Sequence, residues 1–300
     1  MVQFVKVPLF MTLFLIIGSK TLYGLDSDSF AQGNDTHEAE IIQLRYPIIL
    51  VHGILFHDRQ FPIDPWGRIP EMLRQEGIKV YFGHTDAWGD YRSNAEILKN
   101  TIDQVLEENQ TDKVNIIAHS KGGIDSRYLI WRYGYGDKVA SLTTVNTPHQ
   151  GAEVADLVYS QRFMHSELSK RGLEFFGQIY GDRNPNMYNL LYQLTTGHMR
   201  SFNQVVTMDD AVYYQSYYSS ITTALDDMFF FFTHWYIMTV RGNNDGLVSE
   251  VSAAWGPNAR KVPGSLSHID IIDMRKELKL GANVPKIYQD LVQNLAMMGF

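Results

Sequence analysis

The segment from residue 114 to residue 133 constrains the fold of this chain more than any other part of the sequence. It opens with the apolar, β-branched run VNIIA, passes through the turn HSKGG, and continues with apolar residues at helical spacing. A buried strand that enters a helix through so short a turn is typical of a sheet whose strands alternate with helices. Only small residues fit two positions before and two positions after the centre of such a turn, and Ala118 and Gly122 meet this requirement.

Ser120 stands at the centre of this turn and is the candidate nucleophile. The turn would hold the Ser120 hydroxyl out at the edge of the sheet, and the helix start would direct the Lys121 N–H towards a negative charge that develops beside it. The pattern is A-x-S-x-G, a mild departure from G-x-S-x-G. A serine in an ordinary tight turn is the structural alternative, and the strand–turn–helix setting favours the nucleophile.

Strand-like and helix-like runs alternate along most of the chain. Strands are predicted at Tyr46–Val51, Lys79–Phe82, Val114–Ala118, Val139–Val145 and Ile237–Arg241. Helices are predicted from a capping pattern at Ser93 to about Glu108, at Ile124–Tyr133, and from Val284 to Met298. This alternation predicts an α/β fold for residues 25–300, with a mostly parallel central sheet covered by helices on both faces.

Residues 152–236 depart from the alternation, since they run long without a clear strand. Residues 175–236 hold 16 of the 38 aromatic residues of the chain. The stretch therefore predicts a helical insertion over the sheet. Its aromatic side chains are either ordinary core or an apolar cap over a pocket, because large apolar patches usually mark binding surfaces.

Composition excludes several classes of function. The chain has 300 residues and a net charge of −7, which argues against nucleic acid as the main partner, because phosphate binding needs a basic face. It has no cysteine, which excludes disulfides, cysteine-ligated zinc, iron–sulfur clusters and thiol catalysis.

The first 24 residues have the pattern of a secretory signal peptide. Lys6 is followed by an uncharged apolar run from residue 7 to residue 18, which is too short for a comfortable membrane span of roughly twenty residues. Small residues follow at the end of this run. The sequence therefore predicts a secreted protein, with an uncleaved anchor as the alternative, and a polar, acidic lead-in at residues 25–40.

A serine nucleophile needs a general base, and the base needs an acid that orients it. In folds with this turn the three residues follow one another as serine, acid and histidine. Asp245 stands in a loop after the predicted strand Ile237–Arg241, and His268 is the only histidine after Asp245. We therefore expect Asp245 to be the acid and His268 the base. A turn aspartate and a surface histidine are the structural alternatives.

An oxyanion site in such folds needs two backbone donors. Lys121 supplies one, and the loop that follows the strand Tyr46–Val51 supplies the other. Ile54 is the best candidate in this loop, and backbone donation places no demand on its side chain.

Four segments resemble the secreted bacterial true lipases of the pseudomonad type, which are triacylglycerol hydrolases with the α/β-hydrolase fold. They read YPIILVHGIL, VNIIAHSKGG, VNTPHQGAEVADLV and NNDGLVS. The resemblance implies Ser120, Asp245 and His268 as the catalytic triad and the Ile54 and Lys121 amides as the oxyanion hole. It also implies a movable helical lid, which matches the insertion, and a dedicated foldase as a possible partner. Lys121 departs from the family, which usually has His or Gln there.

The resemblance further implies a structural calcium ion near the catalytic histidine. Its ligands would be the Asp226 and Asp270 carboxylates and the backbone carbonyls of Met274 and Leu278. Hard oxygen ligands of this kind suit Ca²⁺. The alternative is that both aspartates are solvated surface groups. If calcium is bound, a chelator should lower the melting temperature.

These features together predict a secreted serine hydrolase that cleaves carboxylic esters, above all long-chain acylglycerols at an oil–water interface. A short-chain esterase or a phospholipase would use the same three residues. A secreted binding protein on a hydrolase scaffold is the alternative from another class, and it would have no need of all three residues.

Overall fold

The central sheet of the computed structural model has six strands, and every neighbouring pair is parallel. The model describes residues 43–54, 57–58, 64–167, 169–171, 178, 181–277 and 281–300, so the predictions for residues 1–24 and 25–40 lie outside the described residues. The strands stand in the order β2-β1-β3-β4-β5-β6. Their bounds are β1 Ile48–Val51, β2 Val80–Phe82, β3 Val114–His119, β4 Val139–Val145, β5 Tyr213–Tyr218 and β6 Ala259–Lys261.

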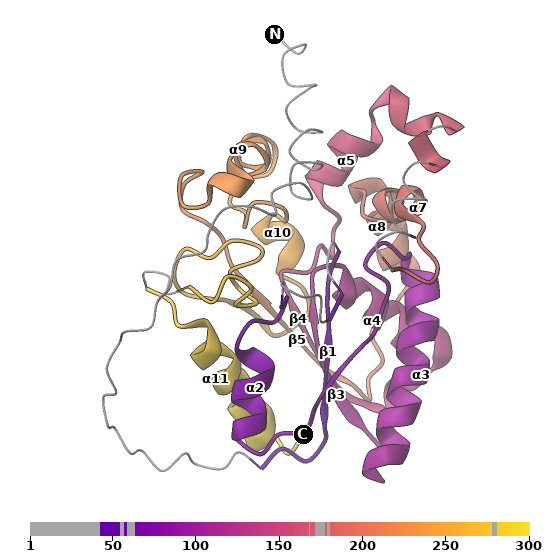
Figure 1. Cartoon of the computed structure of the whole chain (residues 1–300), viewed down its shortest axis with the longest axis vertical. Helices are drawn as coiled ribbons and strands as arrows, with labels where there is room; N and C mark the ends of the chain where they lie inside the picture. The colour runs from indigo at the N-terminus through magenta and orange to yellow at the C-terminus, as the bar shows by residue number, and fades with distance from the viewer. Residues whose placement is uncertain are drawn as a thin grey trace. The chain divides into compact units, whose positions relative to one another are not determined.

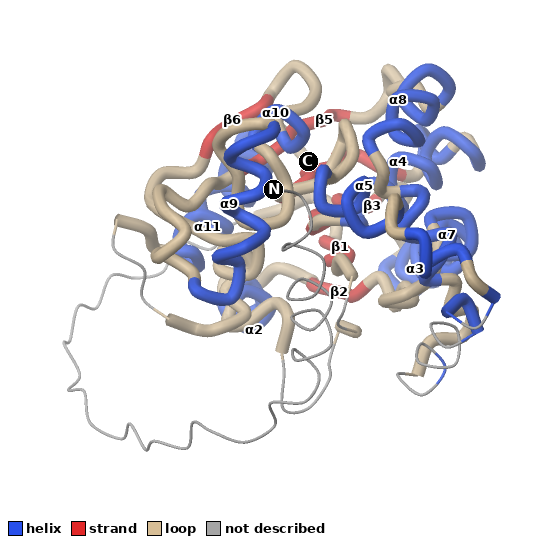
Figure 2. Tube along the Cα trace, turned by 90° about the horizontal axis from the view of Figure 1, so that it is seen from above, coloured by secondary structure: helices blue, strands red, loops and turns tan. Residues whose placement is uncertain are grey.

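Helices cover both faces of this sheet, as Figures 1 and 2 show from two directions. One face carries α2 (Ile69–Gln75) and α11 (Val284–Met297), and the other carries α3 (Tyr91–Asn109) and α4 (Lys121–Tyr133). Successive side chains of a strand point to opposite faces, so Ile48 packs in the first core and Ile49 in the second. The predicted α/β fold with a parallel, doubly covered sheet is confirmed.

The prediction of a strand at Ile237–Arg241 is wrong, because helix α9 (Phe231–Val240) runs through this segment to Val240 and Arg241 is its C-cap. The β-branched residues in this run have a local preference for a strand. The helix, however, starts upstream of them, directly after the 3₁₀ helix η3 (Met228–Phe230), whose N-cap is the Asp227 side chain. The fifth strand of the sheet is instead β5, which lies within residues 152–236, where no clear strand was expected. Its sequence YYQSYY is rich in tyrosine, which packs well between neighbouring strands.

The described elements between β4 and β5 are helical, whereas the helical insertion was predicted to continue to residue 236. These elements are α5 Glu153–Tyr159, η2 Arg162–His165, α7 Met187–Gln193 and α8 Thr196–Val205. Two further helices, η1 Tyr135–Asp137 and α10 Glu250–Ala253, complete the described elements. Figure 1 shows α5 and α9 above the end of the sheet at which the strands finish. No helix in the described part of the chain is long and apolar enough to cross a membrane.

The first turn of α3 differs from the predicted capping pattern. Asp90, not Ser93, is the N-cap, because its carboxylate accepts hydrogen bonds from the Arg92 and Ser93 N–H groups. The Ser93 hydroxyl donates back to the Asp90 carbonyl at 3.1 Å. An aspartate satisfies the free amides at the start of a helix as well as serine does, and its charge suits the helix dipole.

Asp103 connects α3 to the turn before β4. Its carboxylate accepts hydrogen bonds from Lys99 at 2.9 Å, from Lys138 at 2.6 Å and from the Tyr135 hydroxyl at 2.8 Å. Partial burial alone would raise the pKa of Asp103, but the hydrogen bonds from Lys138, Lys99 and Tyr135 outweigh burial and lower this pKa to about 2.

We expect Asp103→Asn to lower the free energy of unfolding at pH 7 by no more than about 1 kcal/mol, because the carboxylate is partly exposed. The pKa is lower in the folded state, so the stabilisation is present above an unfolded value of about 3.9 and is lost as the pH falls towards 2. Urea unfolding of both proteins at pH 7, 4 and 3 tests this. The difference should shrink as the pH falls, and a constant difference would contradict the assignment.

Candidate active site

Ser120 lies in the turn between β3 and α4 in a conformation that serine rarely adopts. Its φ of 53° and ψ of −127° are of the kind that costs on the order of 1–3 kcal/mol, which the surrounding structure must offset. The Ser120 N–H donates to the Val145 carbonyl at 2.9 Å. A Cβ atom on Gly122 would lie 2.5 Å from the His52 carbonyl oxygen, so the requirement for a small residue there is physical.

The side chains of Ser120, His268 and Asp245 form one buried chain of hydrogen bonds. His268 Nε2 lies 2.9 Å from Ser120 Oγ, and His268 Nδ1 lies 2.7 Å from Asp245 Oδ2. None of the three residues is more than 5% exposed. The carboxylate can only accept, so the proton of a neutral imidazole belongs on Nδ1, and Nε2 is left to accept from the Ser120 hydroxyl.

Backbone hydrogen bonds fix the Asp245 carboxylate and the His268 imidazole relative to each other. The His268 N–H donates to the Asp245 carbonyl at 2.9 Å. The second carboxylate oxygen of Asp245 accepts from the Leu247 and Val248 N–H groups at 2.9 and 2.7 Å. Asp245 therefore sits in a tight turn after α9, not in a loop after a strand as predicted. It still reaches the sheet edge, because the Ile221 N–H, a few residues beyond β5, donates to the carbonyl of the preceding Asn244.

His119 is a further member of the site that the sequence analysis did not single out. Its Nε2 lies 2.9 Å from the His268 carbonyl oxygen, and the centroids of the two rings are 4.6 Å apart. Burial, and then the neighbouring His268, lower the pKa of His119 well below its ordinary value. His119 is therefore neutral and donates to the base's backbone. Its place immediately before the serine, at the end of a buried strand, was the available signal.

The predicted oxyanion donors lie in two segments that meet at Ser120. Lys121 is the first residue of α4, and Ile54 follows β1 and Gly53, whose added Cβ would lie 2.7 Å from Ser120 Cβ. Among the hydrogen bonds between described residues, none has the Ile54 or the Lys121 N–H as its donor. The Lys121 N–H lies at the start of α4, where the first amides of a helix have no acceptor within the helix.

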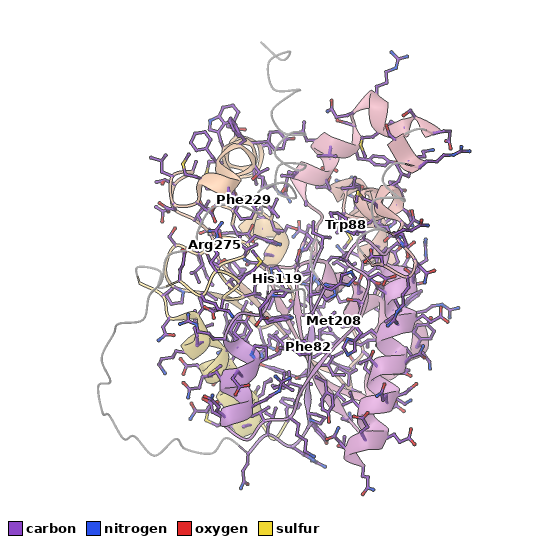
Figure 3. The ribbon with its side chains drawn as sticks, viewed as in Figure 1. Phe82, Trp88, His119, Met208, Phe229 and Arg275 are labelled. Atoms are coloured by element: carbon purple, nitrogen blue, oxygen red, sulfur yellow. The ribbon has the colours of Figure 1, made fainter. Side chains whose placement is uncertain are left out.

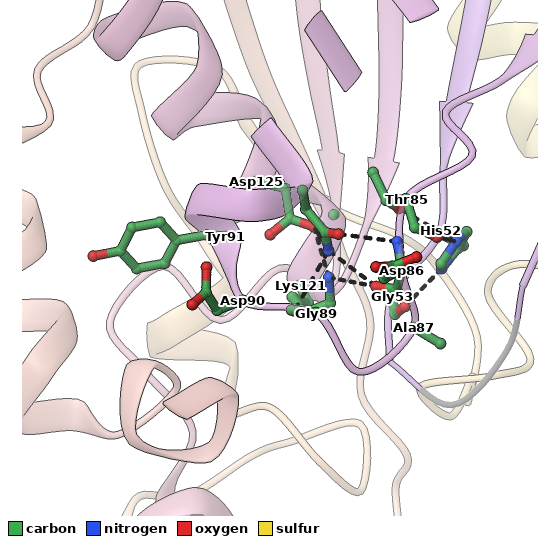
Figure 4. A network of polar contacts seen from close by, with 12 residues as sticks. His52, Gly53, Thr85, Asp86, Ala87, Gly89, Asp90, Tyr91, Lys121 and Asp125 are labelled. Carbon is green, nitrogen blue, oxygen red and sulfur yellow. Dashed lines mark hydrogen bonds and ion pairs between the residues drawn. The ribbon is translucent and has the colours of Figure 1, made fainter. Parts of the chain in front are cut away.

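The Lys121 side chain is buried and paired, as Figure 4 shows. Its Nζ donates to Asp125 Oδ2 at 2.7 Å and to the Asp86 carbonyl at 3.3 Å. Asn94 Nδ2 also donates to Asp125 Oδ2, at 2.9 Å. Burial raises the pKa of Asp125, and Lys121 opposes this rise. The lysine thus joins the serine turn to the loop that carries Asp86.

Two carboxylates, of Asp86 and Asp182, connect the loop that carries Asp86 to the helical insertion by hydrogen bonds. Asp86 accepts from the Arg183 and Asn184 N–H groups at 3.1 and 2.7 Å, and Asp182 accepts from the Ala87 and Trp88 N–H groups at 3.0 and 2.6 Å. Each segment supplies one carboxylate and two amides to the other. The part of the insertion that leads into α7 is therefore fixed to the loop beside Lys121.

The two carboxylates predicted to bind calcium have separate hydrogen-bond partners in the structure. Asp226 is exposed and accepts hydrogen bonds from the Thr222 and Thr223 N–H groups and from the Ser265 hydroxyl. Asp270 is buried and accepts instead from Ser267 and Arg275. Leu278 lies outside the described residues, and Met274 alone of the predicted carbonyl donors is described. Among the described residues, no group of three His, Asp or Glu side chains is arranged to hold a metal ion.

Comparison with known proteins gives consistent matches. The family model described as palmitoyl protein thioesterase matches residues 47–220. Triacylglycerol lipase 2 of Saccharomyces cerevisiae is 29% identical over 227 residues, which cover 72% of this chain and 64% of that protein. The triacylglycerol lipase of Burkholderia plantarii is 34% identical over 174 residues, which cover 53% of this chain and 48% of that protein. The chain thus spans between about half and two thirds of the length of these curated relatives.

Two solved structures share the architecture. The Staphylococcus hyicus lipase matches with a TM-score of 0.68 at 17% identity, covering 86% of this chain and 98% of that chain. The mature Bacillus licheniformis lipase BlEst2 matches with a TM-score of 0.63 at 24% identity, covering 82% of this chain and 91% of that chain. Likeness at this level of identity shows a common fold.

Lys121→Met is expected to lower the free energy of unfolding by about 3–5 kcal/mol, because it leaves the Asp125 carboxylate buried without its cation. Lys121→Met combined with Asp125→Leu should recover most of this loss, since both charges are then gone. Lys138→Met, which breaks a half-exposed pair, is the matched control and should cost less than about 1 kcal/mol. Urea unfolding at pH 7 measures all three. Equal losses in the two single variants, or a double variant as unstable as Lys121→Met, would contradict the buried pair.

Proposed function

This chain belongs to the palmitoyl protein thioesterase family and has the α/β-hydrolase fold, and on this premise we propose that it is a secreted serine hydrolase that cleaves long-chain acyl esters, above all acylglycerols. The observation that carries the proposal is the continuous hydrogen-bonded chain from Ser120 through His268 to Asp245. The names of the curated relatives, which are triacylglycerol lipases, support the ester class.

The proposed reaction has two halves. Ser120 Oγ attacks the ester carbonyl carbon while its proton passes to His268 Nε2, and the resulting imidazolium is stabilised by Asp245. The negative oxygen is held by the Ile54 and Lys121 N–H groups. The C–O bond to the alcohol then breaks, and the alcohol leaves with the proton from His268. In the second half, water attacks the acyl-serine and gives its proton to His268 Nε2, which returns it to Ser120 as the fatty acid departs.

The surface beside the site suits a lipid substrate. Residues 225–240 present a row of exposed apolar side chains, which we call the apolar face: Leu225, Met228, Phe229, Phe232, Trp235 and Met238. The stretch from Met228 to Val240 contains no Asp, Glu, Lys or Arg, and His234 is its one histidine. The Phe230 ring packs against Gly246, the residue that follows Asp245, so this face adjoins the proposed acid. Aromatic and apolar side chains on one helix favour a lipid–water interface.

Thioester cleavage is the second candidate, because the matched family model carries that description. A short-chain esterase and a phospholipase would use the same three residues.

We further propose that the chain is exported through its first 24 residues and that a dedicated foldase assists its folding. Both proposals rest on the apolar amino-terminal run and on the resemblance to secreted lipases.

Ser120→Ala should reduce hydrolysis of p-nitrophenyl palmitate by several orders of magnitude, roughly 10⁴-fold or more, with the melting temperature unchanged within error. The alanine removes only the attacking oxygen. A series of p-nitrophenyl esters from acetate to palmitate, with palmitoyl-thioester alongside, measures the preferred acyl length and the preferred leaving atom. Retained hydrolysis in Ser120→Ala would reject the assignment of the nucleophile.

Replacing both Phe232 and Trp235 by serine should slow hydrolysis of emulsified triolein by about ten-fold or more, because burying even one such ring contributes about 1.5–3 kcal/mol to lipid binding. The rate on soluble p-nitrophenyl acetate should stay within about two-fold of the wild type. Trp131→Ser, on α4, removes an exposed tryptophan outside the apolar face and serves as the control. An equal loss on both substrates would count against a lipid-binding role for this face.

A further inference from the structure

Arg275 joins two buried carboxylates next to the proposed active site. Its NH1 and NH2 atoms donate to Asp227 Oδ2 and Oδ1 at 2.7 and 3.0 Å, and NH1 also lies 3.3 Å from Asp270 Oδ1. The carboxylate side chains are only 2% and 3% exposed, whereas the arginine side chain is 26% exposed. Figure 3 shows Arg275 and Phe229 in the same part of the molecule, and the Asp227 carboxylate bonds to both.

One of these carboxylates controls the turn that carries the proposed base. Asp270 Oδ2 accepts hydrogen bonds from the Ser267 hydroxyl at 2.8 Å and from the Ser267 N–H at 3.2 Å. Ser267 immediately precedes His268. The oxygen that faces Arg275 and the oxygen that faces Ser267 belong to one rigid carboxylate, so Asp270 connects the guanidinium to the residue that precedes His268.

The other carboxylate controls the packing under the proposed acid. Asp227 caps the turn η3, where its Oδ1 accepts from the Phe229 N–H at 3.1 Å. The last residue of that turn is Phe230, whose side chain covers Gly246 so closely that an added Cβ would lie 2.5 Å from Phe230 Cβ. Asp227 thus anchors the segment against which the Asp245 turn rests.

We propose that Arg275 is a positioning residue that acts as an internal cation, holding the His268 turn and the Asp245 turn at the distance that their hydrogen bond requires. A planar guanidinium suits this role because it binds one carboxylate with both NH₂ groups and still reaches a second.

This arrangement differs from the calcium site that the family resemblance implies. A calcium ion takes six to eight oxygen ligands, roughly, and would have to enter between carboxylates. Here the space between Asp227 and Asp270 is bridged by the guanidinium, and Asp226 turns to Thr222, Thr223 and Ser265. The chain therefore supplies a positive charge of its own to Asp270, one of the two carboxylates that were expected to bind the ion.

The test measures kcat, KM and melting temperature for the wild-type protein, Arg275→Met and Arg275→Lys. Only kcat and KM rest on the proposed esterase function, whereas the melting temperature does not. Arg275→Met should lower kcat about 10- to 100-fold with KM within about three-fold, because a misplaced base slows the chemistry and not the binding. Arg275→Lys, which keeps the charge without the fork, should recover part of kcat. Asp227→Asn is the milder variant if Arg275→Met does not fold.

The matched control is Arg68→Met. Arg68 makes a comparable bidentate ion pair with Asp273, which lies in the turn that follows Asp270. Arg68 Nε donates to Asp273 Oδ2 at 2.8 Å, and Arg68 NH2 donates to Asp273 Oδ1 at 2.6 Å. This variant should lower the melting temperature but leave kcat within about two-fold at temperatures where the protein is folded. A merely structural role for Arg275 would give the same result as Arg68→Met, and that outcome would overturn the proposal.

Metal dependence is tested on the wild type by melting temperature alone. Neither EDTA nor millimolar CaCl₂ should change it. A fall with EDTA or a rise with CaCl₂ would show that an ion, and not Arg275, supplies the charge, and it would overturn the proposal. This readout does not depend on Ser120 being the nucleophile, so its failure is distinct from the failure of the proposed function.

Discussion

The hydrogen bond between the His268 imidazole and the Asp245 carboxylate is the interaction on which the rest of the site depends. It can form only if two loops from the last third of the chain meet above a serine that belongs to the middle of the sheet. Several hydrogen bonds hold these two loops together. The two residues also share a backbone hydrogen bond, His119 holds the carbonyl of the base, and Arg275 ties the surroundings of one turn to those of the other. The polar groups of the site are buried, and buried polar groups keep their geometry only when each has its partner.

The parallel sheet supplies the fixed part of this geometry. Every strand from β1 to β5 ends at the same edge, so the loops after β1, β3 and β5 reach one place without long excursions. The strained Ser120 conformation is held by close packing of the turn, since Gly53 lies against Ser120, Gly122 lies against the His52 carbonyl, and the buried Lys121 side chain pairs with Asp125. Strain of this kind at a sheet edge is what brings a hydroxyl out of the core and into contact with an imidazole.

Much of this could be predicted from the sequence. The strands around Ile48, Val114 and Val139 were identified correctly because residues buried on both faces leave unbroken apolar runs. Ser120, Asp245 and His268 were grouped from the turn around Ser120, from their order along the chain and from the resemblance to secreted lipases. The sequence pattern failed where local preference conflicted with tertiary packing. The tyrosines of β5 were assigned to a helical insertion, and the β-branched end of α9 was assigned to a strand. The role of Arg275 could not be inferred, because nothing in the sequence signals that residues 227, 270 and 275 converge.

The most direct test of the account is covalent labelling with a long-chain p-nitrophenyl phosphonate, followed by mass spectrometry of the digested protein. Phosphonates add to a serine only when an adjacent base takes its proton, so the adduct reports the nucleophile and its activation together. The account predicts one adduct, on the peptide that contains Ser120, with loss of ester hydrolysis in proportion to labelling. An adduct on another residue, or an unlabelled protein that still hydrolyses esters, would contradict it.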